Sequence, residues 1–299
     1  LYSDLARTGW FQCGNEDVNR LYSNILWGQK SNFIDIPTDC PQRDERLPWT
    51  GDAQVFASTA CFNMDCRGFY PHFLRLLRQD QEKRGGGVAN YLPYDPMLND
   101  PAPVWGDCAV ILPVTLYQHY GDISILEKSY PMMRDWMAYL EQQDWEHGGR
   151  WIWDHGFQFG DWLALDGITP NSFKGGTEDA LVSTLYWYHS AVLMIQTAAV
   201  LKQDSDCLHF EETAENIRQA LLTEYFTPSG RLAVDTQTAY LLCLRFGLHA
   251  DKEKLLEGLR RRLEKDCYQI TSGFAAAPLV CSVSVSYTHL RAHETVLDL

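Results

Sequence analysis

The residues best suited to chemistry in this chain of 299 residues lie in one run, DCPQRDERLPWTGD, between positions 39 and 52. Its charged side chains are four carboxylates and two arginines: Asp39, Asp44, Glu45, Asp52, Arg43 and Arg46. Pro41 and Pro48 each remove a backbone donor and disfavour helical angles in the preceding residue, so the run is not one ordinary helix. Several carboxylates on an irregular, conformationally fixed segment favour a site for general acid–base catalysis.

The run resembles the signature of the inverting α-L-rhamnosidases of glycoside hydrolase family seventy-eight, within the longer match FIDIPTDCPQRDERLPWTGDAQVFASTA at 33–60. Three further runs follow in the order that this family shows: VWGD at 104–107, FGDWLALDG at 159–167 and TQTAYLL at 236–242. The resemblance extends to about Cys281 and implies an (α/α)6 barrel, also called a six-hairpin toroid. One departure is Pro48, where the family more often has glycine before the tryptophan.

Inverting cleavage of a glycosidic bond uses two carboxyl groups. One protonates the leaving oxygen, and the other activates water on the opposite side, roughly 6.5–9.5 Å away. The acid has to stay protonated near neutral pH, which burial or a nearby like charge favours. For Glu45, the acidic neighbours Asp39 and Asp44 favour the protonated form. Arg43 and Arg46 oppose it if they face Glu45.

The resemblance implies a role for each matched residue. Glu45 is the general acid. Asp39, Arg43 and Asp52 hold sugar hydroxyls, and Trp49 forms part of the pocket wall. The alternative for Asp52 is an N-cap role for the helix that follows it, and a dense run of Asp, Glu and Arg is often only a solvated face.

Two further motifs, W-G-D and G-D-W, place a hydrogen-bond acceptor beside an aromatic ring. Aromatic faces stack on the C–H faces of sugars, so we expect these residues to line the pocket. The residues are Trp105, Asp107, Asp161 and Trp162. For the tryptophans, a place in the core is the alternative.

Composition excludes several classes of partner. The formal charge of −14 and the pI near 5.0 argue against nucleic acid, which requires clustered basic residues. No apolar run approaches the roughly 20 residues of a membrane helix, so we expect no membrane partner. The aromatic content of 13% fits carbohydrate recognition, although a large helical core also uses aromatic residues. We expect a rhamnose-containing carbohydrate as the partner, and the oligomeric state stays open.

The nine cysteines form no CxxC pair, and their odd number favours a reducing compartment, the cytoplasm rather than secretion. The histidines form neither HExxH nor a Cys/His cluster, so we expect no metal site. The glycines at 85–87 lack the lysine of a phosphate loop, so we expect no nucleotide or other cofactor.

Apolar periodicity predicts an all-α chain of about ten helices. They lie near 15–31, 53–62, 68–83, 107–120, 122–130, 131–142, 178–202, 210–221, 236–246 and 252–263. A complete toroid needs twelve, so we expect an incomplete (α/α)6 barrel. The loops at 33–50, 85–106 and 144–174 fall in alternate connections. In such a barrel they share one rim, which would gather Glu45, Trp105 and Asp161 around one pocket.

The end of the chain departs from this pattern. From about Val285 the run VSYTHLRAHETVLDL lacks apolar periodicity and resembles a translated transposase adapter from sequencing libraries. We therefore expect a partial catalytic domain at 1–284 and a non-native tail at 285–299; the alternative is a short divergent terminus. In the family the general base is a glutamate in a later T-x-W-E-like segment, and no such pair follows Phe274. We expect a fragment that lacks its general base and is inactive.

Two alternative functions remain. One is a helical-toroid glycosidase with a different sugar specificity, which a panel of aryl glycosides would reveal. The other is a non-catalytic rhamnose-binding or scaffold fragment, which would bind rhamnose without turnover. The DCPQRDER run favours a rhamnosidase over both.

Overall fold

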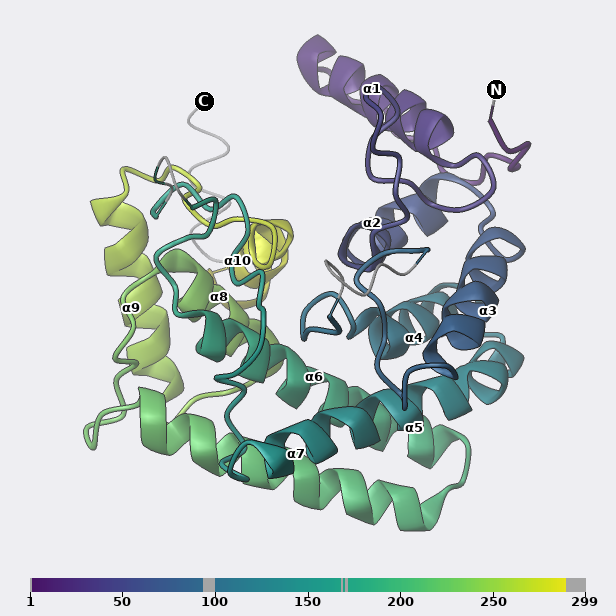
Figure 1. The fold of residues 1–299 in the computed structure, drawn as a ribbon. Coiled ribbons are helices and arrows are strands. Elements are labelled where there is room, and N and C mark those ends of the chain that lie inside the picture. The colour runs from purple at the N-terminus through teal and green to yellow at the C-terminus, as the bar shows by residue number, and fades with distance from the viewer. Residues whose placement is uncertain (1, 94–99, 168, 170–171, 289–299) are drawn as a thin grey trace. The chain divides into compact units, whose positions relative to one another are not determined.

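The computed structural model describes residues 2–93, 100–167, 169 and 172–288. Within these ranges the chain is all-α, as the sequence predicts, and β-structure is limited to isolated bridges. The helices, shown in Figure 1, are α1 (Glu16–Asn32), α2 (Thr50–Asn63), α3 (Phe69–Gln81), α4 (Cys108–Tyr120), α5 (Ile123–Glu146), α6 (Asp179–Val200), α7 (Asp204–Tyr225), α8 (Gln237–Phe246), α9 (Lys252–Lys265) and α10 (Val280–Thr288). A short 3-10 helix, Ala277–Leu279, precedes α10.

Helix α5 differs most from its prediction. Periodicity and proline rules predict that Pro131 begins a new helix, but α5 continues through it, so that prediction is wrong. Pro131 leaves one helical hydrogen bond unmade. The residues that follow it, Met132, Met133 and Trp136, are at most 1% exposed. Burial of this apolar stripe outweighs the missing bond and keeps the helix continuous.

Helix α10 is the second departure, because no periodicity predicts it. It crosses residue 285, where we expect the tail to begin, and ends at Thr288. The remainder of that predicted tail, 289–299, lies outside the described residues. The structure and the prediction both have about ten helices, but only because α10 compensates for the fusion of two predicted helices into α5.

The chain divides into two compact units. The first comprises residues 1–142 and 193–207, and the second comprises residues 143–192 and 208–299. Each has its own buried side chains.

In the first unit, α2 packs against α4. Ala57 and Ala60 of α2 and Ala109 of α4 are fully buried, and these small side chains let the helix backbones approach closely. Beside them, the ring of Phe33 stacks on Phe69 with 4.2 Å between centroids. Phe33 immediately follows α1. The stack therefore fixes the start of the loop at 33–49, which contains most of the acidic run.

In the second unit, α8 is the most buried helix, with every residue from Gln237 to Leu244 buried. It packs against α9 and α10. Gly258 of α9 permits the first of these contacts, because a Cβ there would collide with the ring of Tyr240. Leu255 and Leu259 bury the same side of α9, while most of the helix surface is charged.

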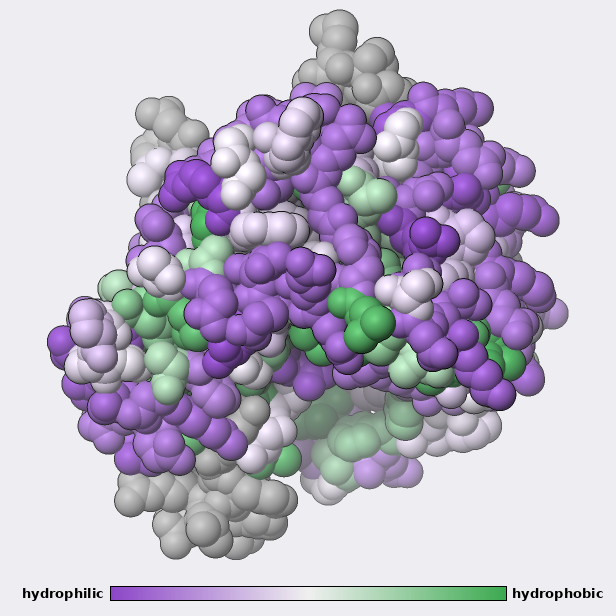
Figure 2. Space-filling view, turned by 90° about the horizontal axis from the view of Figure 1, so that it is seen from below, coloured by the Kyte–Doolittle hydropathy of each residue, from purple (hydrophilic) through white to green (hydrophobic). Residues whose placement is uncertain are grey.

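Polar residues cover most of the surface seen in Figure 2, with hydrophobic residues in small groups. Among the described helices, none combines the length and apolar character needed to span a membrane. None of the nine cysteines, all within the described ranges, takes part in a disulfide. Cys61, Cys108 and Cys243 are buried, whereas Cys207 is partly exposed.

Candidate active site

The carboxylate of Glu45 is held from both sides by neighbours in its own loop. Arg43 Nε donates to Oε2 at 2.8 Å, and the indole Nε1 of Trp49 donates to Oε1 at 3.0 Å. The Glu45 side chain is 31% exposed, so it remains accessible to a ligand. The guanidinium of Arg43 faces Glu45, and this is the arrangement expected from the sequence to oppose protonation of the Glu45 carboxylate. Arg46 is exposed and adopts a left-handed φ of 53°.

Asp39 closes the loop that carries Glu45. Its Oδ1 accepts the backbone N–H of Leu47 at 3.0 Å, and its own N–H donates to the Leu47 carbonyl at 3.0 Å. Its Oδ2 lies 3.5 Å from a terminal nitrogen of Arg43. The Asp39 side chain is only 8% exposed, whereas Arg43 is 60% exposed. The hydrogen bond with Glu45 raises the pKa of Arg43, which stays charged between the two carboxylates.

Asp52 lies in the first turn of α2 and is not its N-cap. The helix begins at Thr50, and Trp49 occupies the N-cap position without a side-chain cap bond, so the N-cap alternative is wrong. Burial raises the pKa of Asp52 to about 7, and the negative charges of Asp39 and Glu45 add to the shift. Asp52 therefore exchanges a proton near neutral pH, a property of groups at catalytic sites.

Trp49 is positioned by the segment around residue 90. Its ring lies 4.7 Å from that of Tyr91 between centroids, and the two residues form an isolated β-bridge. The next residue, Thr50, donates its N–H to the carbonyl of Asn90 at 2.8 Å. No motif points to Asn90 or Tyr91, and their only signal is their place in the loop at 85–106.

Trp105 and Asp107 are buried in the first unit, at 2% and 0% exposure. The indole of Trp105 packs on Gly51 of α2, where a Cβ would lie 2.7 Å from the ring. Asp107 accepts hydrogen bonds from Trp136 Nε1 at 3.0 Å and from the N–H of Val104 at 2.7 Å. These contacts give both residues a supporting role. Their contact with a sugar stays a prediction.

Asp107→Ala is expected to destabilise the chain by about 3 kcal/mol, because it leaves the buried indole N–H of Trp136 and the N–H of Val104 without their acceptor. Urea unfolding followed by tryptophan fluorescence measures the change. The matched control is Asp17→Ala, an exposed carboxylate in the first turn of α1, which should cost less than about 1 kcal/mol. Equal losses in the two variants would contradict the supporting role of Asp107.

Asp161 is the corresponding buried acid of the second unit, at 0% exposure. Its carboxylate accepts the Thr238 hydroxyl and the N–H groups of Gly273, at 2.8 Å, and Ala275, at 3.1 Å. Burial raises the pKa of Asp161, and these hydrogen bonds limit the rise. Asp161 therefore joins three segments that the sequence separates: the FGDW run, the TQTAYLL run and the chain before α10.

Trp162 is partly exposed and belongs to an aromatic group in the second unit. Its ring contacts Phe159 and Phe173, with centroids 6.0 Å and 5.6 Å away. Phe173 is 56% exposed. The group thus presents ring surface to solvent, as a sugar platform would, although sugar binding by Trp162 stays a prediction.

A possible metal site coincides with the acidic loop. Asp39, Cys40 and Glu45 each offer one ligand atom, and these three atoms lie within 4.8 Å of one another. The sequence predicts no metal site here. Arg43 pairs with both carboxylates of this group. Its guanidinium supplies the positive charge that a cation would otherwise contribute.

The predicted site residues fall into two sets. In the first set, Arg43 contacts Asp39 and Glu45, and Trp49 contacts Glu45. Asp52 belongs to the same set, because the negative charges of Asp39 and Glu45 help to raise its pKa. Asp161 and Trp162 belong to the second unit. A single pocket that includes both sets stays a prediction.

The chain is similar to known glycosidases along nearly its whole length. The model of the bacterial alpha-L-rhamnosidase 6 hairpin glycosidase domain matches residues 6–298. An alpha-L-rhamnosidase of Formosa agariphila is 36% identical over 287 residues, which cover 94% of this chain and 30% of the relative.

Two solved structures share the fold. The Streptomyces avermitilis alpha-L-rhamnosidase complexed with L-rhamnose aligns with a TM-score of 0.86 and 32% identity. The native enzyme from Aspergillus terreus aligns with a TM-score of 0.87 and 32% identity. Each alignment covers 96% of this chain, but only 27% and 33% of the two relatives. The chain therefore spans about a third or less of the length of these relatives.

Proposed function

Because the chain belongs to the bacterial α-L-rhamnosidase six-hairpin glycosidase family, we propose that it is part of the catalytic domain of an enzyme that removes terminal α-L-rhamnose from glycosides or polysaccharides. The reaction is a single displacement with inversion. The observation that carries this proposal is the loop of Asp39, Arg43 and Glu45, in which an accessible carboxylate is held in a fixed geometry. L-rhamnose bound to the Streptomyces relative supports the choice of sugar.

Glu45 is the proton donor to the leaving oxygen in this proposal. Without substrate, Arg43 pairs with Glu45. Since the Arg43 side chain is 60% exposed, it can turn towards sugar hydroxyls without disturbing the core. Its departure removes the positive charge beside Glu45 and favours the protonated form that general acid catalysis requires.

Asp39 and Asp52 complete the sugar contacts. Asp39 is fixed by its backbone bonds to Leu47, so its orientation survives movement of Arg43. Asp52, with a pKa of about 7, can donate or accept a hydrogen bond near neutral pH. Trp49 keeps its contact with Glu45 and orients the acid from the other side.

The base that activates water comes, in this proposal, from a segment that the present chain does not contain. Inversion requires a second carboxylate across the sugar from the acid, and no W-E pair follows Phe274. The chain by itself therefore shows little or no hydrolysis, because Glu45 cannot also activate the water.

Hydrolysis of an aryl α-L-rhamnoside tests the proposal, with this chain and a longer protein that contains it assayed side by side. We expect turnover by the longer protein only. NMR of the first-formed sugar should show the β-anomer, the product of inversion. Equal rates of turnover by this chain and by the longer protein would refute the proposal that this chain lacks the general base. A folded longer protein that hydrolyses other aryl glycosides but not the rhamnoside would refute the sugar specificity.

A further inference from the structure

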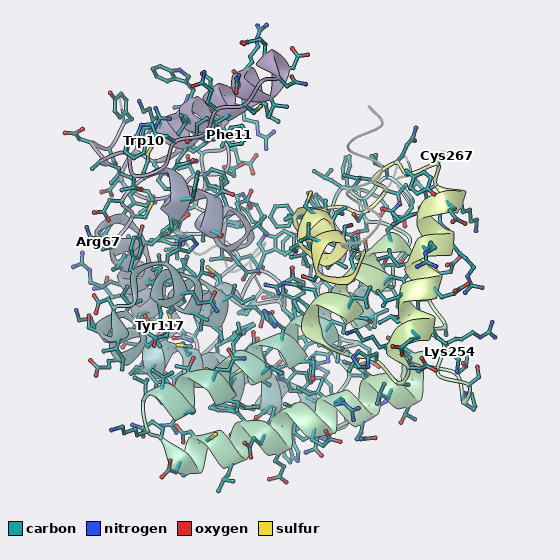
Figure 3. The ribbon with its side chains drawn as sticks, turned by 180° about the vertical axis from the view of Figure 1, so that it is seen from behind. Trp10, Phe11, Arg67, Tyr117, Lys254 and Cys267 are labelled. Atoms are coloured by element: carbon teal, nitrogen blue, oxygen red, sulfur yellow. The ribbon has the colours of Figure 1, made fainter. Side chains whose placement is uncertain are left out.

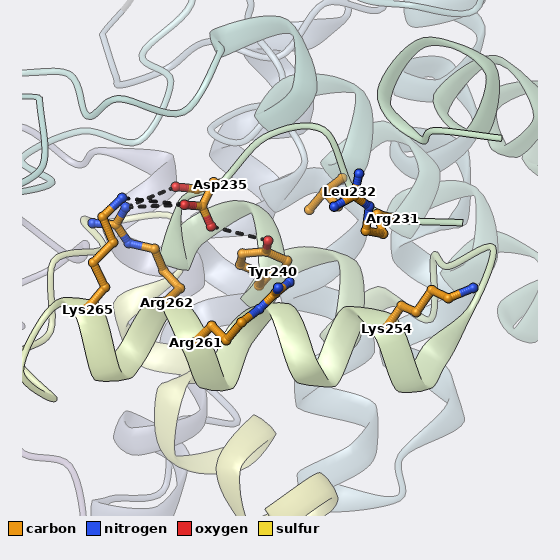
Figure 4. Close-up of a pocket in the computed structure, with 8 residues that line it drawn as sticks. All are labelled: Arg231, Leu232, Asp235, Tyr240, Lys254, Arg261, Arg262 and Lys265. Atoms are coloured by element: carbon orange, nitrogen blue, oxygen red, sulfur yellow. Dashed lines mark hydrogen bonds and ion pairs between the residues drawn. The ribbon is translucent and has the colours of Figure 1, made fainter. Parts of the chain in front are cut away.

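A cavity of about 320 Å³ in the second unit contains none of the residues discussed as the active site. It lies between α9 and the segment that leads into α8 (Figure 4). Five of its eight lining residues are basic: Arg231, Lys254, Arg261, Arg262 and Lys265. In a chain with a formal charge of −14, this local excess of positive charge runs against the overall composition.

Helix α9 supplies four of these five cations. Arg261 and Lys265 follow Lys254 by seven and eleven residues, which is about two and three helical turns, so the three side chains lie on one face of the helix. Figure 3 labels Lys254 and Cys267 near the two ends of α9, and the basic face extends between them. Gly258 is buried at the edge of this face, and the lack of a side chain there leaves space for the Tyr240 ring.

At one end of the cavity, the positive charges are balanced by acids. Arg262 forms a close ion pair with Asp266 and lies 3.7 Å from Asp235. Lys265 also lies 3.7 Å from Asp235, whose other oxygen accepts the Tyr240 hydroxyl at 3.3 Å. This end therefore carries little net charge, and the carboxylate of Asp235 repels an anion there.

At the other end, the charge is not balanced. Lys254 pairs with Asp251 at 2.7 Å. Within the described part of the chain, however, neither Arg231 nor Arg261 has a carboxylate within ion-pair distance, and both side chains are exposed. Figure 4 places Arg231 and Lys254 away from Asp235, with Arg261 between the two ends. One unpaired guanidinium group, that of Arg231, thus lies at this end, and a second, that of Arg261, lies between the two ends of the same cavity.

We propose that this cavity binds a small molecule that carries an oxyanion, such as a sugar carboxylate, sulfate or phosphate, through Arg231 and Arg261. Guanidinium groups donate paired, charge-assisted hydrogen bonds that match the geometry of these anions. The volume lies at the small end of the range for ligand pockets, about 300–1,000 Å³, which suits a single sugar ring. Repulsion from Asp235 orients the anion towards the two arginines.

Isothermal titration calorimetry of the 299-residue chain tests this proposal at low, constant ionic strength. The probes are glucuronate, glucose 6-sulfate, glucose 6-phosphate and inorganic phosphate, with glucose as the neutral control. We expect at least one charged probe to bind with a Kd of roughly 1 mM or tighter, and glucose not to bind. The comparison separates a carboxylated from a sulfated or phosphorylated sugar, and a sugar from free phosphate.

The double variant Arg231→Gln with Arg261→Gln is expected to weaken this binding by about tenfold or more. The matched control, Arg20→Gln with Arg260→Gln, makes the same charge change at exposed arginines outside the cavity and should keep the affinity. The proposal fails if no charged probe binds, if the double variant binds as tightly as the unchanged chain, or if the control loses as much affinity. Because the test requires no turnover, its result is independent of the rhamnosidase proposal.

Discussion

Glu45→Gln is expected to lower kcat/KM of the longer rhamnosidase by about 10³-fold on a substrate with a poor leaving group, because glutamine cannot protonate the glycosidic oxygen. Glutamine keeps nearly the same size, and its amide oxygen can accept from one of the two donors, Arg43 or Trp49, in a loop that Asp39 closes independently. The loss should therefore be chemical rather than structural. Steady-state hydrolysis of an alkyl α-L-rhamnoside measures it.

Leaving groups of different basicity separate an acid from a positioning residue. A dinitrophenyl α-L-rhamnoside departs without protonation, so on this substrate the Glu45→Gln variant should lose far less activity. Glu16→Gln is the matched control, because Glu16 is an exposed carboxylate in the first turn of α1, outside the run from Asp39 to Asp52, and it should change kcat/KM little on either substrate. Equal losses on both substrates would show that Glu45 positions other groups and does not donate the proton.

Asp52→Asn is expected to stabilise the chain at about pH 8 by up to about 4 kcal/mol, and to change its stability little at about pH 4. The pKa of Asp52 is raised to about 7 by burial first and by Asp39 and Glu45 next, so the folded state holds its proton more tightly than the unfolded state. The stability that this proton provides is complete below about pH 4 and is lost as the pH rises through about 7. Asparagine has no such proton to lose.

Urea unfolding at the two pH values measures this difference, with Asp44→Asn as the exposed control. An equal change at both pH values would show that Asp52 titrates as an ordinary exposed carboxyl. In the longer enzyme, the same substitution should lower rhamnosidase activity. A variant that is more stable yet less active would indicate that this buried carboxyl serves the site at a cost in stability.

Much of the fold follows from local patterns. Apolar residues at helical spacing predict an all-α chain, and most of the predicted helices form within a few residues of their expected ends. Pro131 marks where the local rules fail, because burial of the following stripe overrides the lost hydrogen bond. Helix α10 has no clear apolar period, so no local signal predicts it.

The candidate site, like the fold, is predicted in part by local sequence patterns. The run from Asp39 to Asp52 contains the residues and prolines that make an irregular acidic loop, and its closest contacts join residues at most eight positions apart. Sequence spacing alone can therefore locate it. The spacing of Arg43 and Glu45 does not say whether the Arg43 side chain points towards the carboxylate, and only the structure shows that it does.

The sequence by itself determined the helical class, the family resemblance and the acidic loop, because these depend on residue order over short distances. Only the tertiary structure decided which acids are buried. Asp161 meets Thr238, Gly273 and Ala275, which are 77, 112 and 114 residues away, and no local pattern encodes such contacts. The raised pKa of Asp52 likewise follows from burial. Desolvation depends on everything packed around a group, and that packing exists only in the folded chain.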